Sequence, residues 1–397
     1  MSRIGIVAEF NPFHTGHKYI IEYAKNNLNA NSVVIALGNE FTQRGGVAII
    51  DRYSRAAAAI DAGADLIVSM PVTASCASAE IFAECGVCLL EACGCDRIVC
   101  GYEGGDKEML HKTAQLLVEE PPAFKDTLQK GLRAGKSYPS AREDAVFSCI
   151  DSPEVKLLLS NPNNILAIEY EKAIIKHGFD IELIPVKRQG NGYNDSDNDG
   201  EFVSASYIRK QILAGNLPAV RNHLTDFSYN ELNDECNKNV LLSDNDLSLP
   251  LHLELLGHND YSKFLDVSPD LSDRIKKLLP EFVSISQFTS LLKNKSLTAS
   301  RIRRALIHIL LGITDKSLDK LREQNFVPEL WILAASKHGL SLLKDIKSKN
   351  SVTLFFSLNE KDETGDRSLF HLELIRALRI NKSGIWLPNE YQRKVHL

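Results

Sequence analysis

The sequence predicts an α/β fold: a doubly wound parallel sheet followed by a mainly helical C-terminal domain. The first hundred or so residues alternate short apolar runs with amphipathic helical patterns, which is the spacing typical of βαβ units. The apolar runs are almost uninterrupted, as expected of strands covered by helices on both faces. From about residue 107 the pattern becomes mainly helical and, further on, rich in leucine.

The expected elements follow one another in a regular order. Strands are expected at residues 3–9, 32–37, 65–70, 97–100 and 181–186, and helices at residues 14–26, 51–62, 78–92 and 206–214. A last β–α piece is expected at residues 351–356 and 368–378. A doubly wound sheet binds its ligand beyond the carboxyl ends of its strands. The site is therefore expected in the loops that follow the first four strands.

The length of 397 residues suggests two domains. We place them at residues 1–215, with the ligand site, and at residues 216–397. Residues 271–350 hold 15 Lys and Arg against 7 Asp and Glu, although the whole chain has a net charge of −5. This asymmetry suits a polyanion bound at the C-terminal end.

The N-terminal segment is too short and too broken by charge for a signal peptide. We find no apolar run near the roughly 20 residues that a membrane span requires. A cytoplasmic protein without a membrane partner is therefore expected.

Six cysteines lie close together in the sequence. Cys85 and Cys88 have metal-ligand spacing, but they sit in an apolar helical pattern without a second such pair or a nearby histidine. We therefore expect no metal and mainly a packing role for Cys76, Cys85, Cys88, Cys93, Cys95 and Cys100. Whether the cluster has any other role stays open.

Residues 11–17 read Asn-Pro-Phe-His-Thr-Gly-His and follow the first expected strand. Pro12 stiffens the turn, and the free N–H groups at the start of the next helix suit a phosphate. His14 and His17 are three residues apart and project from one face of the first turn, while Gly16 allows close approach of a nucleotide. Two imidazole donors at a helix N-terminus can stabilise charge that develops on an α-phosphate.

This segment resembles the His-x-Gly-His signature of the nucleotidyltransferase superfamily. Further motifs resemble the bacterial tRNA(Met) cytidine acetate ligase family within it; they lie at residues 5–14, 38–45, 63–68, 101–106, 163–166, 188–194 and 204–209. The resemblance implies a nucleotidyltransferase-like sheet and an ATP-dependent ligase. Such a ligase activates acetate as acetyl-adenylate and acetylates the exocyclic amine of the wobble cytidine in elongator methionine tRNA, with Mg²⁺ bridging the phosphates of ATP.

The resemblance, together with the chemistry of each residue, assigns the site. The catalytic residues are expected to be His14, His17 and Arg44, the last of which meets the acetate carboxylate. The expected ATP-binding residues are Val7, Ala8, Glu9, Phe10, Asn11, Pro12, Phe13, Thr15, Gly16, Lys18, Tyr19, Ile20, Gly101, Asn163, Asn164, Arg188, Ser204, Ser206 and Arg209. The expected tRNA-binding residues are Lys293, Lys295, Arg301, Arg303 and Arg304, with Arg301 and Arg304 on one helix face.

Several alternatives stay open. Asn163 and Asn164 are equally suited to cap a helix at Ile165, and Ser204 or Ser206 to cap the next one. Arg44 and the basic set would otherwise be solvated or salt-bridged surface residues. The rival functions are an adenylyl- or cytidylyltransferase acting on a small phosphorylated metabolite, and a nucleotide- or RNA-binding protein without catalysis.

Overall fold

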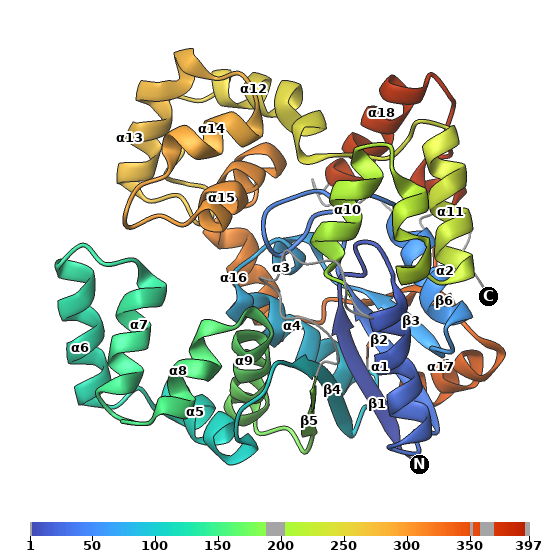
Figure 1. Ribbon diagram of the computed structural model, residues 1–397, viewed down its shortest axis with the longest axis horizontal. Coiled ribbons are helices and arrows are strands. Elements are labelled where there is room, and N and C mark those ends of the chain that lie inside the picture. The colour runs from blue at the N-terminus through green and yellow to red at the C-terminus, as the bar shows by residue number, and fades with distance from the viewer. Residues whose placement is uncertain (1, 188–202, 350–351, 358–368, 394–397) are drawn as a thin grey trace.

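The computed structural model describes residues 2–187, 203–349, 352–357 and 369–393. Its centre is one sheet with the strand order β5-β4-β1-β2-β3-β6-β7 (Figure 1). The strands are β1 (Arg3–Ala8), β2 (Ser32–Leu37), β3 (Leu66–Ser69), β4 (Arg97–Tyr102), β5 (Glu182–Lys187), β6 (Leu330–Ala335) and β7 (Leu354–Phe355). The pairs β5–β4, β4–β1, β1–β2 and β2–β3 are all parallel. The α/β prediction and the first five expected strands are confirmed.

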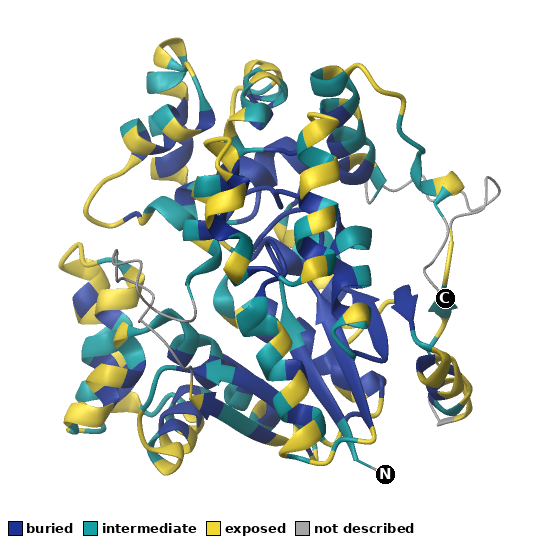
Figure 2. Ribbon diagram, turned by 45° about the vertical axis from the view of Figure 1, so that its right-hand side comes forward, coloured by how far each residue is buried: buried dark blue, intermediate teal, exposed yellow. Residues whose placement is uncertain are grey.

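The helices of the first half lie on both faces of this sheet. Alternate residues of β2 point to opposite sides: Val33, Ile35 and Leu37 pack with α1 and α2, whereas Val34 and Ala36 pack with α4. β2 is buried along its whole length, and Figure 2 shows dark blue strands at the centre of the molecule. The helices concerned are α1 (Thr15–Asn26), α2 (Arg52–Asp61), α3 (Val72–Ser75), α4 (Ala79–Ala92) and α9 (Pro162–His177).

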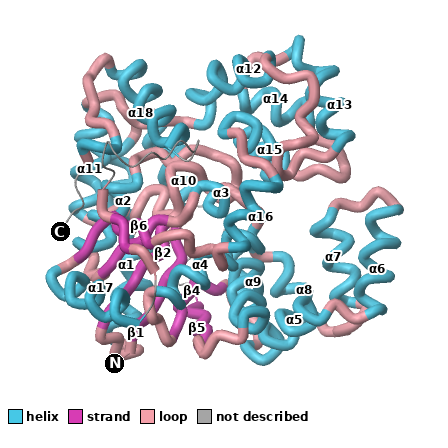
Figure 3. Tube along the Cα trace, turned by 180° about the vertical axis from the view of Figure 1, so that it is seen from behind, coloured by secondary structure: helices cyan, strands magenta, loops and turns pink. Residues whose placement is uncertain are grey.

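The remaining helices form separate groups around the sheet (Figures 1 and 3). One group comprises α5 (Lys107–Glu119), α6 (Pro122–Arg133), α7 (Tyr138–Phe147) and α8 (Pro153–Ser160). A second comprises α12 (Ser248–Leu256), α13 (Pro269–Leu278), α14 (Ile285–Leu292), α15 (Ala299–Leu311) and α16 (Asp315–Glu323). The others are α10 (Ala205–Leu213), α11 (Asp226–Asn237), α17 (Lys337–Lys349) and α18 (Phe370–Ser383), with short 3₁₀ helices that include η5 (Glu390–Gln392).

The sheet is not confined to residues before 215. β6 pairs antiparallel with β3, so that Leu66 lies opposite Ala335 and Ser69 opposite Trp331. This strand is not among those expected from the sequence, because its apolar run lies in a leucine-rich stretch that otherwise forms helices. Part of the C-terminal half therefore completes the sheet of the N-terminal half.

The cysteine cluster is part of the core. Cys85 and Cys88 lie in α4 and are buried, as are Cys76, Cys93, Cys95 and Cys100. Burial raises the pKa of the Cys100 thiol to about 12, so it is protonated and unreactive at neutral pH. Among the described residues, no group of three or more His, Cys, Asp or Glu side chains is placed to hold a metal ion. No helix in the described ranges is long and apolar enough to cross a membrane.

The contact of α17 with the residue before β3 tests how the C-terminal half packs on the sheet. A Cβ on Gly339 would lie 1.8 Å from the main-chain oxygen of Asp65, too close for the backbone to accept. Gly339→Ala is expected to lower the free energy of unfolding by about 1–3 kcal/mol or more. Chemical denaturation of this variant and of Lys344→Ala, an exposed position on the same helix, measures the effect. Equal stability of the two variants would contradict this packing.

Candidate active site

The junction between β1 and α1 holds both motif histidines in one fixed arrangement. His14 is the N-cap of α1, and its Nδ1 accepts a hydrogen bond from the Gly16 N–H at 3.1 Å. The His14 N–H donates in turn to Nδ1 of His17 at 3.2 Å. Since both Nδ1 atoms accept from the backbone, the neutral rings carry their protons on Nε2. Each imidazole therefore has a donor at Nε2 and a main-chain anchor at Nδ1.

Aromatic contacts fix the planes of the two rings. The centroids of His14 and His17 are 3.7 Å apart in a stacked arrangement, and the ring of Phe10 lies 4.8 Å from that of His17. Phe10 has a φ of 49°, a left-handed conformation that a bulky side chain rarely adopts. The loop before α1 therefore stores backbone strain at the site, where such strain is commonly found.

These histidines lie in the wall of a large cavity at the carboxyl edge of the sheet. Its volume is about 1050 Å³. The sequence-predicted residues that line it are Val7, Ala8, Glu9, Phe10, Asn11, His14, Gly16, His17, Tyr19, Ile20, Arg44, Gly101, Asn163, Ser204, Ser206, Arg209, Arg303 and Arg304. The loops that follow β1 and β2 and the end of β4 thus meet at the edge where a doubly wound sheet binds ligand.

Other predicted residues do not line the cavity. Pro12 and Phe13 are buried behind the motif, while the Thr15 hydroxyl donates to the His223 carbonyl at 3.2 Å. Lys18 is exposed and lies 3.7 Å from Glu22. Lys293, Lys295 and Arg301 also lie outside the lining. Arg188 lies outside the described residues.

Asn163 and Asn164 have different surroundings. The helix α9 begins at Pro162, so neither asparagine caps a helix at Ile165. Asn164 is fully buried; its side-chain oxygen accepts from the Glu103 N–H at 2.9 Å, and its amide donates to the Gly104 carbonyl at 3.0 Å. Asn164 therefore shapes the loop after β4, whereas Asn163 lines the cavity and donates to the Glu103 carboxylate at 2.7 Å.

Glu9 joins the loops after β1 and β2. Its Oε1 accepts from the Gln43 N–H at 2.6 Å. Burial raises the pKa of the Glu9 carboxyl, while the Gln43 hydrogen bond and the charges of Arg209, Arg55 and Arg44 act in the opposite direction. Gln43 is followed by Arg44, which is exposed at the mouth of the cavity.

Arg55 was missed by the sequence analysis. Its buried guanidinium donates to the main-chain oxygens of Glu9 at 2.7 Å, Gly38 at 2.9 Å and Asn39 at 2.8 Å. It thereby satisfies carbonyl groups of two loops that form the cavity wall. No local motif marks this residue, because its partners come from the ends of two other elements.

The start of α10 closes the cavity on a further side. Ser204 is the N-cap and accepts from the Tyr207 N–H at 3.3 Å, so the capping alternative is correct for this serine. Its hydroxyl lies 3.0 Å from that of Ser206. Arg209 donates to the Asn11 main-chain oxygen at 2.6 Å, which ties α10 to the histidine motif.

The predicted basic set does not form one exposed helix face. Arg304 is buried and donates to Asp266 at 3.0 Å, so the expected pairing of Arg301 with Arg304 on the surface is wrong. Arg303 lies 3.7 Å from Asp244. Helical spacing alone gave no sign of the two aspartates, which come from segments distant in the sequence. Lys293 and Lys295 are exposed.

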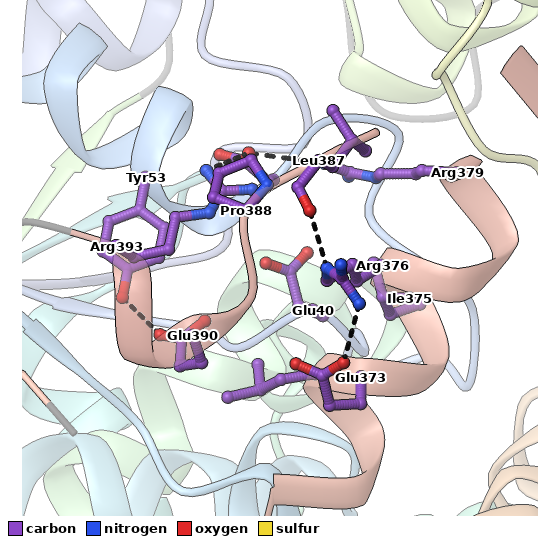
Figure 4. A pocket seen from close by; sticks show the side chains of 12 residues that line it. Glu40, Tyr53, Glu373, Ile375, Arg376, Arg379, Leu387, Pro388, Glu390 and Arg393 are labelled. Carbon is purple, nitrogen blue, oxygen red and sulfur yellow. Dashed lines mark hydrogen bonds and ion pairs between the residues drawn. The ribbon is translucent and has the colours of Figure 1, made fainter. Parts of the chain in front are cut away.

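A cluster of charged residues fastens the C-terminal segment to the loop that carries Glu40 (Figure 4). Asp51 accepts from the Ser54 N–H at 2.8 Å and lies 3.1 Å from Arg393 and 3.4 Å from Arg379. Arg52, which is fully buried, pairs with Glu390. Residues 379–393 thus contact the N-terminal end of α2, which follows the loop that carries Arg44.

The fold and the cavity are those of a nucleotide-binding α/β protein, and comparisons with known proteins define it further. Residues 1–391 match the family described as HIGH Nucleotidyl Transferase. The tRNA(Met) cytidine acetate ligases of Thermoanaerobacter sp. and Caldanaerobacter subterraneus are 33% and 35% identical to this chain, each over 94% of it and 93% of the relative.

Solved structures agree with these matches. The apo structure of Thermotoga maritima TmcAL has a TM-score of 0.91 at 25% identity and covers 100% of both chains. The same protein bound with alpha-thio ATP has a TM-score of 0.87 over 96% of both chains. The chain therefore belongs to the tRNA(Met) cytidine acetate ligase family of the HIGH nucleotidyltransferases.

The Asp51 cluster predicts an acid-dependent stability. The arginines hold the pKa of the Asp51 carboxyl well below its usual range, although burial acts against them. Its stabilising contribution is thus complete above the unfolded pKa of about 4 and decreases as the pH falls from there towards the folded pKa. Asp51→Asn is expected to lower the free energy of unfolding by about 3–5 kcal/mol at pH 7, because it leaves the buried Arg379 and the partly buried Arg393 without their charged partner.

Urea denaturation of both proteins between pH 3 and pH 7 measures this difference. The difference in the free energy of unfolding between wild type and Asp51→Asn should become smaller in the acid range. Asp61→Asn, at an exposed position in α2, should be as stable as wild type. A stability difference that does not depend on pH would show that the charge of Asp51 is not its cause.

Proposed function

We propose that the protein is a cytoplasmic ATP-dependent ligase that activates acetate as acetyl-adenylate and acetylates the wobble cytidine of elongator methionine tRNA. The observation that carries this proposal is the anchored pair of Nε2 donors, on His14 and His17, in the cavity of a chain from this family. The names of the relatives supply the acceptor and the acyl group.

In the first step, an acetate oxygen attacks the α-phosphorus of ATP, and the bond to the β-phosphate oxygen breaks to release pyrophosphate. The Nε2 donors of His14 and His17 stabilise the negative charge that develops on the α-phosphate. Arg209 and the hydroxyls of Ser204 and Ser206, at the start of α10, face the departing pyrophosphate. Arg44 pairs with the acetate carboxylate as it approaches.

In the second step, the exocyclic amine of cytidine attacks the acetyl carbon. The bond between this carbon and the phosphate oxygen breaks, AMP leaves, and the amine loses one proton. The protein contributes mainly by holding the two reactants in one cavity, since orientation alone accounts for much of the acceleration in such transfers.

Mg²⁺ enters this scheme as part of the substrate MgATP. Two glutamates of the cavity already have cationic partners: Glu80 lies 2.6 Å from Lys172, and Glu169 lies 2.6 Å from Arg142. The chain's described residues thus offer the ion no cluster of ligands of their own. Phosphate oxygens and water are the ligands that Mg²⁺ usually keeps in such sites.

Basic residues near the cavity suit the polyanionic acceptor. Lys293 and Lys295 are exposed before α15, while Arg303 lies in α15 itself. Contacts of such residues with phosphates supply salt-dependent affinity for RNA. Arg304 is occupied by Asp266 and contributes through packing.

The deciding experiment incubates the protein with MgATP, labelled acetate and total tRNA, followed by digestion and identification of the labelled nucleoside. Label in N4-acetylcytidine from elongator methionine tRNA is expected. Label that never leaves the acyl-adenylate, or exchange of ATP without acetate, would favour transfer to a small metabolite instead.

The two histidines are expected to act mainly on the first step. His14→Ala and His17→Ala should each reduce acetate-dependent ATP–pyrophosphate exchange by roughly 10²–10³-fold, the usual cost of removing such a donor. His14→Asn separates catalysis from capping, because asparagine keeps an N-cap acceptor but lacks the Nε2 donor. His111→Ala, on an exposed histidine outside the cavity, is the control. Full exchange activity in His14→Asn would contradict the proposed role.

Arg209 is expected to affect nucleotide affinity. Arg209→Ala removes a charged donor at the cavity and its hydrogen bond to Asn11, so ATP should bind about 10-fold to 100-fold more weakly. Calorimetry against Lys210→Ala, the exposed neighbour that does not line the cavity, isolates the effect. If the two variants bind ATP with equal affinity, Arg209 has only a structural role.

A further inference from the structure

The cavity extends beyond the residues of the nucleotide motifs. Its volume of about 1050 Å³ lies at the upper limit of the roughly 300–1,000 Å³ typical of pockets for one small molecule. Part of the lining comes from the first turns of α7 and α15, which belong to two different helical groups (Figures 1 and 3). None of the motif residues lies in α7.

The α7 side carries an aromatic ring in an unusual position. Tyr138 is the first residue of α7 and lines the cavity, yet it is 44% exposed. Ser137 and Ser140 lie beside it in the lining. A large exposed ring that lines a cavity does little for the core, but it offers a face on which an unpaired base can stack.

The α15 side carries positive charge. Thr298 caps the helix by accepting from the Arg301 N–H at 3.3 Å, and Thr298, Ala299 and Ser300 line the cavity. Arg303, one turn further on, also lines it; its side chain keeps 34% of its surface exposed beside Asp244. A half-exposed guanidinium at this place suits a phosphate of an RNA backbone.

We propose that the end of the cavity between α7 and α15 binds the acceptor nucleotide of the RNA in an unpaired state, with its base stacked on Tyr138 and a backbone phosphate beside Arg303. This rests on the proposed function and adds the place of the acceptor. The continuity of the cavity lets the base reach the acyl group at His14 and His17. A paired base is held within a duplex by its partner and cannot enter an enzyme cavity, so the acceptor must lie in a loop or be flipped out.

The test compares two reactions of the same proteins. Acetate-dependent ATP–pyrophosphate exchange requires no RNA, whereas transfer of labelled acetate to tRNA requires the acceptor. Tyr138→Ala is expected to lower kcat/KM for tRNA by about 10-fold to 100-fold, the loss of one base–aromatic stack. Tyr138→Phe should retain most of it, because phenylalanine keeps the ring. Tyr391→Ala removes a tyrosine of similar exposure that does not line the cavity, and should match wild type.

Arg303 is tested through KM for tRNA and through the salt dependence of tRNA binding. Arg303→Ala is expected to raise KM for tRNA about tenfold and to make the salt dependence of binding shallower by about one counterion. Arg133→Ala, at an exposed position of α6 outside the cavity, is the matched control and should change neither. A loss of folding stability alone would not alter the salt dependence.

A direct probe does not depend on variant activity. An anticodon stem-loop RNA with 5-iodocytidine at the acceptor position should cross-link under ultraviolet light to the peptide that contains Tyr138. A cross-link confined to other peptides would overturn the assignment. Wild-type kcat/KM in both Tyr138→Ala and Arg303→Ala would also overturn it, and so would an equal loss of pyrophosphate exchange. If the wild type forms no acetyl-adenylate, the proposed function itself is contradicted.

Discussion

The hydrogen bonds from the first turn of α1 to Nδ1 of His14 and His17 constrain the rest of the site. Each bond satisfies a main-chain N–H that the start of a helix leaves unpaired, and each fixes one ring nitrogen as an acceptor. The same two contacts that begin the helix therefore place the proton of each neutral ring on Nε2. Stacking of the rings at 3.7 Å between centroids leaves little freedom for either to turn away.

Around this turn the structure satisfies main-chain groups with charged side chains from distant segments. Arg55 binds the carbonyls at the ends of β1 and β2, and Arg209 binds the carbonyl of Asn11. Glu9 in turn accepts from the loop that carries Arg44. Loops at a sheet edge are otherwise mobile, so these bonds keep the cavity wall in one shape before any ligand binds. Such preorganisation is what electrostatic catalysis requires.

The features that the sequence predicted are the ones that local chemistry determines. Apolar runs that alternate with helical patterns predicted β1 to β5, and the motif at residues 11–17 predicted a helix that begins at a phosphate-binding edge. The cap that His14 forms on this helix was not predicted. Contacts between distant segments could not be predicted in this way. Leu330–Ala335 forms β6 only because it pairs with β3, and Arg304 is buried only because Asp266 lies beside it. Neither pairing is marked by spacing or composition.

The same long-range contacts join the C-terminal half of the chain to the sheet and to the cavity. The cavity is lined on one side by β1, α1 and α10 and on another by α7 and α15. β6 and the Asp51 cluster hold the C-terminal segment on the sheet, while Gly45 packs against the backbone of Arg303 and Arg304, where a Cβ would meet Arg304 N at 2.4 Å. A shift of α15 towards this loop would therefore displace Gly45 and the neighbouring Arg44. The basic helix and the loops around the histidines are packed directly against each other, which suits a reaction between a bound adenylate and a macromolecular acceptor.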